Sequence, residues 1–274
     1  MNFTEHADFR RALALAGQLA DASRSIARSY FRRPMEIEQK ADHSPVTVAD
    51  RAIETELRRM IRAEFPAHGI QGEEFGYETG SEFIWILDPI DGTRSFISGF
   101  PLFGSLIALV YAGRPVLGLI EIPATGERWI GCTGLPTSFN GEPARTSACD
   151  RIERARVYST TTDEFKGDDL RRFDALSRRA AMRRFGGDCY LYGLLASGHC
   201  DLVIEAGLKS HDYLSLVPVV EGAGGKISDW QGHALDLQSG GHVVAAATES
   251  LWLCAVEALG SGGGLIHERL EVQE

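Results

Sequence analysis

The stretch of sequence that decides the fold is WILDPIDGT, at residues 85–93. Its first residues belong to an unbroken apolar run, FIWIL at residues 83–87, which is typical of a β-strand covered on both faces. We expect this strand to end at Asp88, because Pro89 cannot donate a ladder hydrogen bond and Gly92 permits a tight turn. The sequence therefore predicts that acidic side chains project from the end of a buried strand.

Asp88 and Asp91 can converge at such a turn, with the backbone carbonyl of Ile90 between them. Two carboxylates and a carbonyl are hard oxygen ligands, and Mg²⁺ prefers such ligands. The alternative is an ordinary turn with two solvated aspartates, since acidic pairs at strand ends are common. The segment alone leaves both interpretations open.

Three other acidic segments favour the metal interpretation. Glu73 lies in the triplet GEE, which follows a short run that is consistent with a strand. Asp50 stands in the first turn of a helix for which Thr47 is a suitable N-cap, and Asp212 stands at the start of a later helix. Acidic residues at helix N-termini also complement the helix dipole, so Asp50 and Asp212 each keep that structural alternative.

The elements around these residues predict a layered α/β protein. Apolar residues at helical spacing indicate two long helices, at residues 5–31 and 47–65. Three strands of a meander are expected at residues 105–111, 116–122 and 128–132. The later part of the chain alternates between strands and helices, with strands expected at 155–160, 202–205, 226–229 and 243–247 and helices at 168–177, 190–197, 213–221 and 249–259.

A stretch without periodicity, residues 134–150, separates the two kinds of pattern. We place a boundary there, between an N-terminal α+β subdomain at residues 1–149 and a C-terminal α/β subdomain at residues 150–274. The first carries most of the acidic residues above, and the second carries Asp212. Within the second, Pro218 is expected to kink the helix that contains it.

Composition excludes several classes of protein. The chain has 274 residues, with 28 Lys and Arg against 38 Asp and Glu, so its formal net charge is −10. A chain with this net charge is not expected to bind nucleic acid or anionic membranes. It can still bind an anionic substrate where metal ions reverse the local charge. No stretch approaches the ~20 apolar residues of a membrane span, and we expect no signal peptide. The five cysteines form no C-x-x-C pair, so we expect reduced thiols and a cytoplasmic protein.

Taken together, these residues resemble the inositol monophosphatase family of Mg²⁺-dependent, lithium-sensitive phosphatases. The resemblance reaches from the first helix to about residue 247, and it is carried by DPIDGT, the upstream GEE, Lys40, Asp50, Asp212 and the run GAGG at residues 222–225. It implies a layered αβαβα sandwich of the inositol monophosphatase/fructose-1,6-bisphosphatase type, with an antiparallel sheet first and a mixed sheet second. Haloacid-dehalogenase-type phosphatases fit poorly, because their D-x-D-G-T motif spaces the two acids differently.

The resemblance also implies metal ligands. These are the carboxylates of Glu73, Asp88, Asp91 and Asp212, with the carbonyl of Ile90, and they would hold two or three Mg²⁺ ions. When ionised, the four carboxylates contribute about −4. The bound ions would offset that charge and leave enough positive field for a phosphate dianion.

Further roles follow from the same resemblance. Asp50 and Thr93, together with Glu73, would orient and deprotonate the attacking water. The backbone amides of Gly92 and Thr93 would hold phosphate oxygens. His211 departs from the family pattern, which often has an aromatic residue such as Trp before the aspartate. That departure leaves the aspartate ligand intact and changes the wall of the pocket.

Several strings narrow the substrate. KADHSPVT at residues 40–47, TRSFISG at 93–99 and GGDCY at 186–190 look like the histidinol-phosphatase branch of the family. That branch makes histidinol from histidinol phosphate in histidine biosynthesis. The close alternative is an enzyme acting on inositol-1-phosphate or on a broader set of sugar phosphates.

Histidinol phosphate carries an ammonium group and an imidazole beside its phosphate. Asp188 and Glu205 can complement those groups, and Ser95 is the third residue expected to bind substrate. Asp188 also keeps a structural interpretation, as a cap for the helix that starts near Tyr190. A regulatory, non-catalytic protein on the same fold remains the alternative from another class. The resemblance further implies a homodimer.

Overall fold

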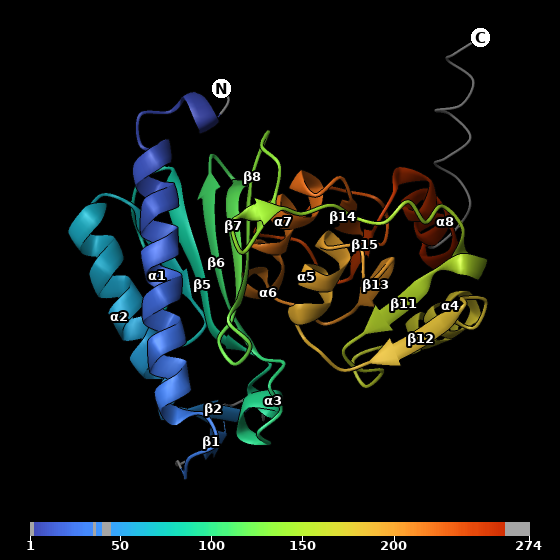
Figure 1. Cartoon of the computed structure of the whole chain (residues 1–274), viewed down its shortest axis with the longest axis horizontal. Coiled ribbons are helices and arrows are strands. Elements are labelled where there is room, and N and C mark those ends of the chain that lie inside the picture. Colours follow the sequence, from blue (N-terminus) through green and yellow to red (C-terminus); the bar gives the residue numbers. More distant parts are fainter. Residues whose placement is uncertain (1–2, 35–36, 40–44, 261–274) are drawn as a thin grey trace.

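The strand predicted from residue 83 lies inside the larger of the two main sheets (Figure 1). The computed structural model describes residues 3–34, 37–39 and 45–260, and in it this strand is β5 (Phe83–Asp91). β5 pairs in parallel with β3 (Gly69–Gly72) and antiparallel with β6 (Gly104–Tyr111). The spatial order of the eight strands is β10-β9-β8-β7-β6-β5-β3-β4. The other members are β4 (Gly76–Glu78), β7 (Arg114–Ile122), β8 (Glu127–Cys132), β9 (Ser138–Phe139) and β10 (Glu142–Pro143).

Two long helices, α1 (Phe9–Tyr30) and α2 (Val48–Glu64), cover one face of this sheet (Figure 1). Their inward faces are apolar at helical spacing, so that Leu19 and Ile53 are fully buried in the same cluster as Trp85 of β5. α2 begins where the sequence predicts, after Thr47, whose side chain accepts a hydrogen bond from the amide of Ala49.

The second sheet comes from the later part of the chain, in the order β12-β11-β13-β15-β14. β11 pairs in parallel with β12 and β13, whereas β15 pairs antiparallel with β13 and β14. The sheet is therefore mixed, as predicted. Its strands are β11 (Arg156–Ser159), β12 (Met182–Phe185), β13 (Leu202–Glu205), β14 (Lys226–Asp229) and β15 (Val243–Ala246).

A layer of helices lies between the two sheets (Figure 1). It consists of α5 (Tyr190–Ala196), α6 (Ser210–Tyr213) and α7 (Leu216–Gly222), while α4 (Asp168–Ser177) and α8 (Glu249–Leu259) cover the outer face of the second sheet. The layers alternate α, β, α, β, α, which confirms the predicted sandwich. The short elements are η1 (Phe3–Glu5), β1 (Ile37–Gln39), β2 (Pro45–Thr47), α3 (Thr93–Ile97) and η2 (Ile152–Arg154).

One predicted helix is wrong. The sequence predicts a single kinked helix over residues 213–221, but the chain forms two, α6 and α7, separated at Leu214 and Ser215. Pro218 produces no kink, because it lies in the first turn of α7, where its missing amide would have had no helical partner. The break lets α6 approach β5 and β6 while α7 packs on β7 and β8.

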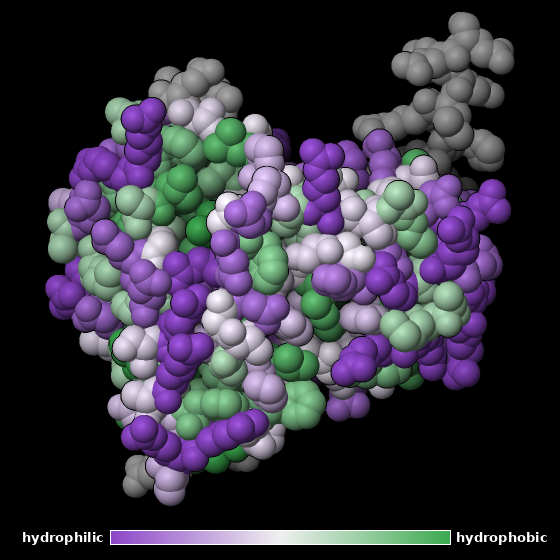
Figure 2. Space-filling view, in the orientation of Figure 1, coloured by the Kyte–Doolittle hydropathy of each residue, from purple (hydrophilic) through white to green (hydrophobic). Residues whose placement is uncertain are grey.

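The surface is largely hydrophilic on the face shown in Figure 2. Hydrophilic side chains cover both ends of the face in Figure 2, and apolar residues are scattered among them. Among the described residues, none of the helices is both long enough and apolar enough to cross a membrane.

Candidate active site

A bulge near the end of β5 lets Asp88 and Asp91 point to the same side. Residues three apart in a regular strand face opposite sides of the sheet, but the pairing of β5 with β6 shifts register between these two. The Ser105 hydroxyl holds the bulge by donating a hydrogen bond to the Pro89 carbonyl at 2.6 Å. Gly92, with a φ of +79°, then turns the chain into α3. The prediction that the strand ends at Asp88 is therefore wrong: it reaches Asp91 because the bulge accommodates Pro89.

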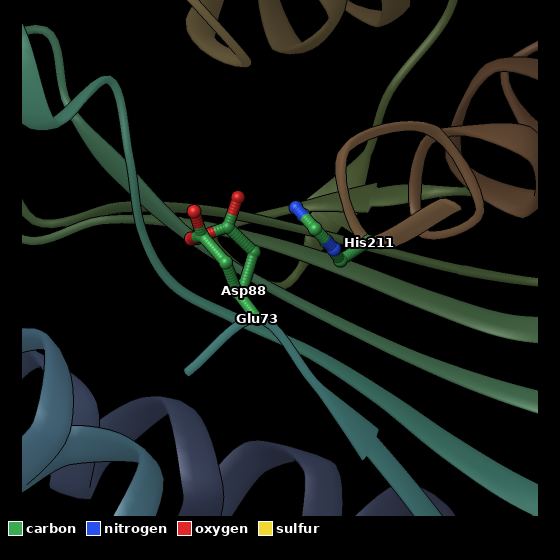
Figure 3. Close-up of side chains that lie close together, drawn as sticks. All are labelled: Glu73, Asp88 and His211. Atoms are coloured by element: carbon green, nitrogen blue, oxygen red, sulfur yellow. The ribbon is translucent and has the colours of Figure 1, made fainter. Parts of the chain in front are cut away.

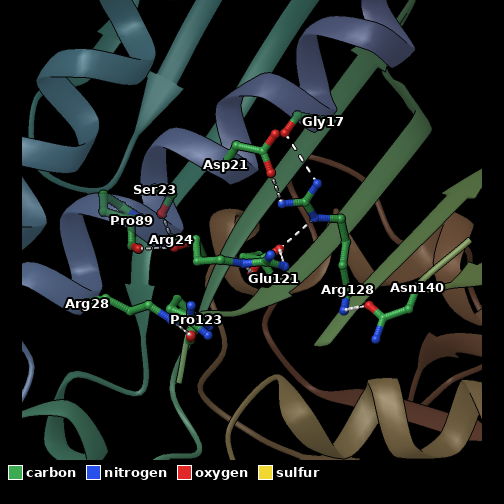
Figure 4. A network of polar contacts seen from close by, with 11 residues as sticks. Gly17, Asp21, Ser23, Arg24, Arg28, Pro89, Glu121, Pro123, Arg128 and Asn140 are labelled. Atoms are coloured by element: carbon green, nitrogen blue, oxygen red, sulfur yellow. Dashed lines mark hydrogen bonds and ion pairs between the residues drawn. The ribbon is translucent and has the colours of Figure 1, made fainter. Parts of the chain in front are cut away.

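Behind the bulge, buried polar contacts tie α1 to the sheet (Figure 4). Glu121 of β7 is fully buried, and its carboxylate accepts hydrogen bonds from both Arg24 of α1 and Arg128 of β8. Ser23 of α1 contacts the hydroxyl of Ser105, which in turn holds the bulge. Because breaking one partner of a buried ion pair leaves an uncompensated charge, this network resists local opening.

Acidic side chains from three parts of the chain meet at this end of β5. Asp88, Asp91 and Asp212 each place a carboxylate oxygen within 4.8 Å of the others, and so do Glu73 and Asp88 with a ring nitrogen of His211. Figure 3 shows Glu73 beside Asp88, with His211 facing them from α6. Glu73 arrives there because β3 runs parallel to β5, so both strands end at the same edge of the sheet.

A buried carboxylate of α2 holds the turn that carries Glu73. Glu54 accepts hydrogen bonds from the amide of Glu74 at 2.7 Å and from the guanidinium of Arg58 at 2.8 Å. Gly72 is needed at this point, because a Cβ there would lie 1.9 Å from a carboxylate oxygen of Glu54. The position of Glu73 thus depends on a contact between α2 and the end of β3.

The clustered carboxylates disfavour one another's charged forms. Burial raises the pKa of Asp88 well above its usual range, and the charges of Glu73 and Asp91 raise it further. Burial, followed by Asp188 and Asp212, does the same for the pKa of Asp91. Within the described part of the chain, the Oδ1 atom of Asp88 is buried with no hydrogen-bond partner. Crowded hard-oxygen ligands with an unused lone pair fit a divalent cation, which would supply the missing positive charge.

Asp50 and Thr93 take part in local contacts. One oxygen of Asp50 accepts hydrogen bonds from the amide (2.8 Å) and hydroxyl (2.6 Å) of Thr47, so Asp50 does cap α2. Its other oxygen, Oδ1, is buried and has no partner among the described residues, and burial raises the pKa of this carboxyl. The Thr93 hydroxyl donates to the Ile90 carbonyl at 3.1 Å. No hydrogen bond of the described residues joins Asp50 to Thr93.

A cavity of about 160 Å³ adjoins the carboxylate cluster on the side of the second sheet. Asp91 and Asp212 line it together with Asp188, Glu205 and Tyr192. Two larger hollows of about 450 and 340 Å³ lie elsewhere, and each is lined by a single acidic side chain. Of these three hollows, the carboxylate-rich cavity is therefore the one whose charge suits a cationic ligand.

Two of the acids in this cavity have defined partners. Asp188, in a left-handed conformation with a φ of +48°, accepts a hydrogen bond from the Ser95 hydroxyl at 2.8 Å and lies against Gly92. Its side chain does not cap α5, so the capping interpretation is wrong. Glu205 ends β13 and accepts from the amide of Thr160 at 2.7 Å, and burial raises its pKa to about 8.

The chain as a whole matches one family. A model of the inositol monophosphatase family matches residues 8–261. The chain belongs to the inositol monophosphatase family. It is accordingly a phosphatase, a phosphoric monoester hydrolase that acts on small phosphorylated compounds. The resemblance inferred from DPIDGT and GEE is confirmed.

Individual relatives of this phosphatase point to more than one substrate. A protein of Arabidopsis thaliana named bifunctional phosphatase IMPL2, chloroplastic, is 45% identical over 240 residues, covering 86% of this chain and 69% of the relative. A histidinol-phosphatase of Chlorobaculum parvum is 36% identical over 253 residues, covering 91% and 97%. The solved structure of an inositol monophosphatase from Zymomonas mobilis is 46% identical, covers 93% of this chain and 100% of that one, and has a TM-score of 0.86.

The structure gathers the carboxylates of Glu73, Asp88, Asp91 and Asp212 at one end of β5 and places Asp188 and Glu205 in the adjoining cavity. Asp50 and Thr93 make separate local contacts instead. Lys40 lies outside the described residues. The sequence analysis missed the part of the cavity wall formed by Thr160, Thr161, Glu164 and Tyr192. No motif marks these residues, because they reach the site only through the packing of α5 and the second sheet against β5.

Proposed function

We propose that this phosphatase is a Mg²⁺-dependent histidinol-phosphatase, which hydrolyses histidinol phosphate to histidinol and phosphate in histidine biosynthesis. The observation that carries the proposal is the acidic cavity beside the carboxylate cluster. Asp188 and Glu205 face the place where a leaving group would lie, and the leaving group of histidinol phosphate bears an ammonium and an imidazole. The relatives named histidinol-phosphatase support the same substrate.

The metal side of the site uses five ligands in this proposal. The carboxylates of Glu73, Asp88, Asp91 and Asp212 and the carbonyl of Ile90 would hold two or three Mg²⁺ ions. When bound, these ions lower the pKa of water and neutralise charge on the phosphoryl group. The crowding of the carboxylates and the partnerless Oδ1 of Asp88 support this assignment.

The chain's own residues would then position the reactants. Asp50 presents its partnerless Oδ1 as an acceptor for a proton of the attacking water, and Glu73 stands close enough to influence its charge. The Thr93 hydroxyl would orient the same water once it leaves the Ile90 carbonyl. The backbone amides of Gly92 and Thr93, where β5 turns into α3, would hold phosphate oxygens. No covalent bond between phosphate and enzyme is needed.

The leaving-group side uses Asp188, Glu205 and Ser95. Ser95 donates to Asp188 and so keeps one carboxylate oxygen in place, which leaves the other for a substrate N–H. Glu205 is held in a similar way by the amide of Thr160. The ammonium of the substrate would compensate the charge that burial makes unfavourable on these two acids.

The test is phosphate release with Mg²⁺, comparing histidinol phosphate, inositol-1-phosphate and fructose-1,6-bisphosphate by kcat/KM. We expect at least about a tenfold preference for histidinol phosphate, which corresponds to ~1.4 kcal/mol of transition-state binding. Asp188→Asn should reduce that preference, whereas Asp163→Asn in the neighbouring surface loop should not. A preference for inositol-1-phosphate would overturn the substrate and leave the phosphatase chemistry standing.

Inositol-1-phosphate or a broader set of sugar phosphates is the second candidate. The 46% identity to the Zymomonas mobilis inositol monophosphatase favours it. An acidic pocket can also accept polyol hydroxyls, because carboxylates accept hydrogen bonds from neutral donors. The substrate comparison above separates the two candidates directly.

We also propose a cytoplasmic homodimer. All five cysteines are free thiols, which is the usual state in a reducing compartment. The molar mass of the purified protein, measured by light scattering, tests the dimer. The mass of a monomer would contradict it.

A further inference from the structure

Tyr192 presents a buried hydroxyl that the proposed mechanism does not use. The side chain lies on α5, is 2% exposed, and its hydroxyl has no hydrogen-bond partner within the described residues. A hydroxyl removed from water without a partner costs free energy, so buried polar groups in folded proteins are nearly always paired. The missing partner of Tyr192 therefore needs an explanation.

The location of Tyr192 supplies one. Its side chain lines the cavity beside the carboxylate cluster, together with Asp188 and Glu205. Burial, then the nearby charges of Glu205 and Asp91, raise the pKa of this phenol well above its usual range. The hydroxyl consequently keeps its proton and has one hydrogen bond to donate.

The groups around it include carboxylates, which can accept, and the Tyr192 hydroxyl, which has a hydrogen bond to donate. An ionised carboxylate only accepts hydrogen bonds, so Asp188 in that form calls for an N–H group on the ligand. Glu205, whose raised pKa keeps it protonated at neutral pH in the empty site, would do the same once a cationic ligand favours its charged form. The Tyr192 hydroxyl calls for an acceptor on the same ligand. An ammonium has no acceptor, whereas a neutral imidazole has one N–H and one bare ring nitrogen. A heteroaromatic ring of that kind satisfies both sides of the cavity.

We propose that Tyr192 is a specificity-determining residue, which donates its hydroxyl hydrogen to a ring-nitrogen acceptor on the leaving group while the neighbouring carboxylates take the N–H groups. This inference rests on the proposed function and adds to it a residue and a chemical requirement. The favoured substrate carries a hydrogen-bond acceptor on its ring as well as a positive charge.

The experiment compares Tyr192→Phe with Tyr190→Phe. Both tyrosines lie on α5, but the Tyr190 hydroxyl donates to Glu127 and does not line the cavity. Each variant is assayed with Mg²⁺ on histidinol phosphate and on phosphoethanolamine, which has an ammonium group and no ring. Histidinol without phosphate is tested as an inhibitor, because its binding reports on the leaving-group pocket alone.

We expect Tyr192→Phe to lower kcat/KM for histidinol phosphate about 10- to 100-fold, since a site built to hydrogen-bond a ligand loses discrimination when one partner is removed. The decrease in kcat/KM of Tyr192→Phe for phosphoethanolamine should be at least tenfold smaller. Histidinol should inhibit Tyr192→Phe more weakly than wild type, by the same factor as the decrease in kcat/KM for histidinol phosphate. Tyr190→Phe should behave as wild type. The melting temperature of Tyr192→Phe should not fall, because the hydroxyl has no partner to lose.

The outcomes separate the two proposals. If the wild type prefers histidinol phosphate and Tyr192→Phe matches it, the inference about Tyr192 is overturned and the proposed function stands. An equal loss on both substrates also overturns it, because Tyr192 would then act on the fold or the metal side. If the wild type shows no preference for histidinol phosphate, the proposed function fails, and with it the ring-nitrogen role of Tyr192.

Discussion

The two sides of the active site are built differently. On the metal side, buried polar contacts secure the backbone that carries the ligands, with Ser105 on the Pro89 carbonyl and Glu54 on the Glu74 amide. On the side proposed for the leaving group, Asp188 lies in the turn before α5 and Tyr192 lies within α5, and the Tyr192 hydroxyl has no partner among the described residues. The first arrangement keeps a charge cluster in place before any ligand arrives. The second leaves hydrogen-bonding capacity for a substrate to fill.

Under the proposed function, this contrast separates the residues that serve chemistry from those that serve specificity. Ligands that share one charge cluster must be held against mutual repulsion, so their supports are numerous and buried. Groups that choose between substrates must remain available, so their hydrogen bonds are completed by the ligand. Changes on the metal side should therefore abolish turnover of every substrate, whereas changes on the other side should alter preference.

The largest expected effect breaks the metal side outright. Asp91→Asn removes one charged ligand and should lower phosphate release by about 10³-fold, or ~4 kcal/mol of transition-state stabilisation, on every substrate. The metal-free variant should melt no lower than the wild type, because burial and then the charges of Asp188 and Asp212 raise the pKa of Asp91 and penalise its charged form. Asp150→Asn, at an exposed site, serves as the control in both assays. Activity close to wild type in Asp91→Asn would rule out the metal mechanism.

The next prediction loosens the support of Glu73. In the wild type, one carboxylate oxygen of Glu54 accepts a hydrogen bond from the Glu74 amide and the other accepts one from Arg58. Glu54→Gln replaces one of these oxygens with an N–H₂ group, which then faces an N–H donor and cannot accept its hydrogen bond. We expect Mg²⁺ affinity to fall about 10- to 100-fold, as for other groups that orient metal ligands. Calorimetric titration with Mg²⁺ measures this. Glu56→Gln, on the same helix but in a surface pair with Arg59, should leave the affinity unchanged; an equal shift in both variants would contradict the prediction.

A smaller effect is expected from the bulge itself. Ser105→Ala leaves the buried Pro89 carbonyl without its hydroxyl donor, which should cost about 1–3 kcal/mol of unfolding free energy. Because Asp88 and Asp91 flank that carbonyl, kcat should also fall, by a smaller factor than the fall in Mg²⁺ affinity expected of Glu54→Gln. Ser29→Ala removes a similar hydroxyl-to-carbonyl bond at an exposed site and should do neither. Urea unfolding and steady-state kinetics report the two effects, and a stable Ser105→Ala with full activity would refute the proposed support.

The smallest expected effect is a pH dependence of stability that comes from Glu205, on the leaving-group side. The pKa of Glu205 is raised from 4.5 to about 8, so between those values the folded protein holds a proton that the unfolded chain has lost. The free energy of unfolding of the metal-free protein should therefore fall as pH rises through this window. Glu205→Gln has no carboxyl to titrate, so its unfolding free energy should not decrease in this way. Above pH 8 its melting temperature should therefore exceed that of the wild type by a few degrees, since 1 kcal/mol of unfolding free energy shifts the melting temperature by about 2–4 °C. Parallel curves for the two proteins from pH 5 to 9 would contradict the raised pKa.

Much of the metal side was predictable from particular residues. Asp88 and Asp91 are three residues apart in one motif, and Glu73 directly follows a short run that is consistent with a strand. Local sequence was therefore enough to predict these three residues as members of the cluster. The bulge was not predictable, because Pro89 usually ends a strand and only the partner strand β6 shows that pairing resumes at Asp91. Local sequence also could not predict which way the Asp188 side chain points, because its hydrogen-bond donor, Ser95, lies 93 positions away in the chain.

The sequence by itself determined the family, the layered order of elements and which acidic residues cluster at the end of β5. It did so because hard-oxygen ligands and glycine turns leave a short, chemically constrained motif in DPIDGT and GEE. Only the tertiary structure decided that Asp88 and Asp91 face one side, that Asp188 turns toward Ser95, and that Tyr192 lines a cavity of about 160 Å³ with a hydroxyl that has no partner among the described residues. These features depend on how distant elements pack, and packing against a remote neighbour leaves no local pattern in the chain.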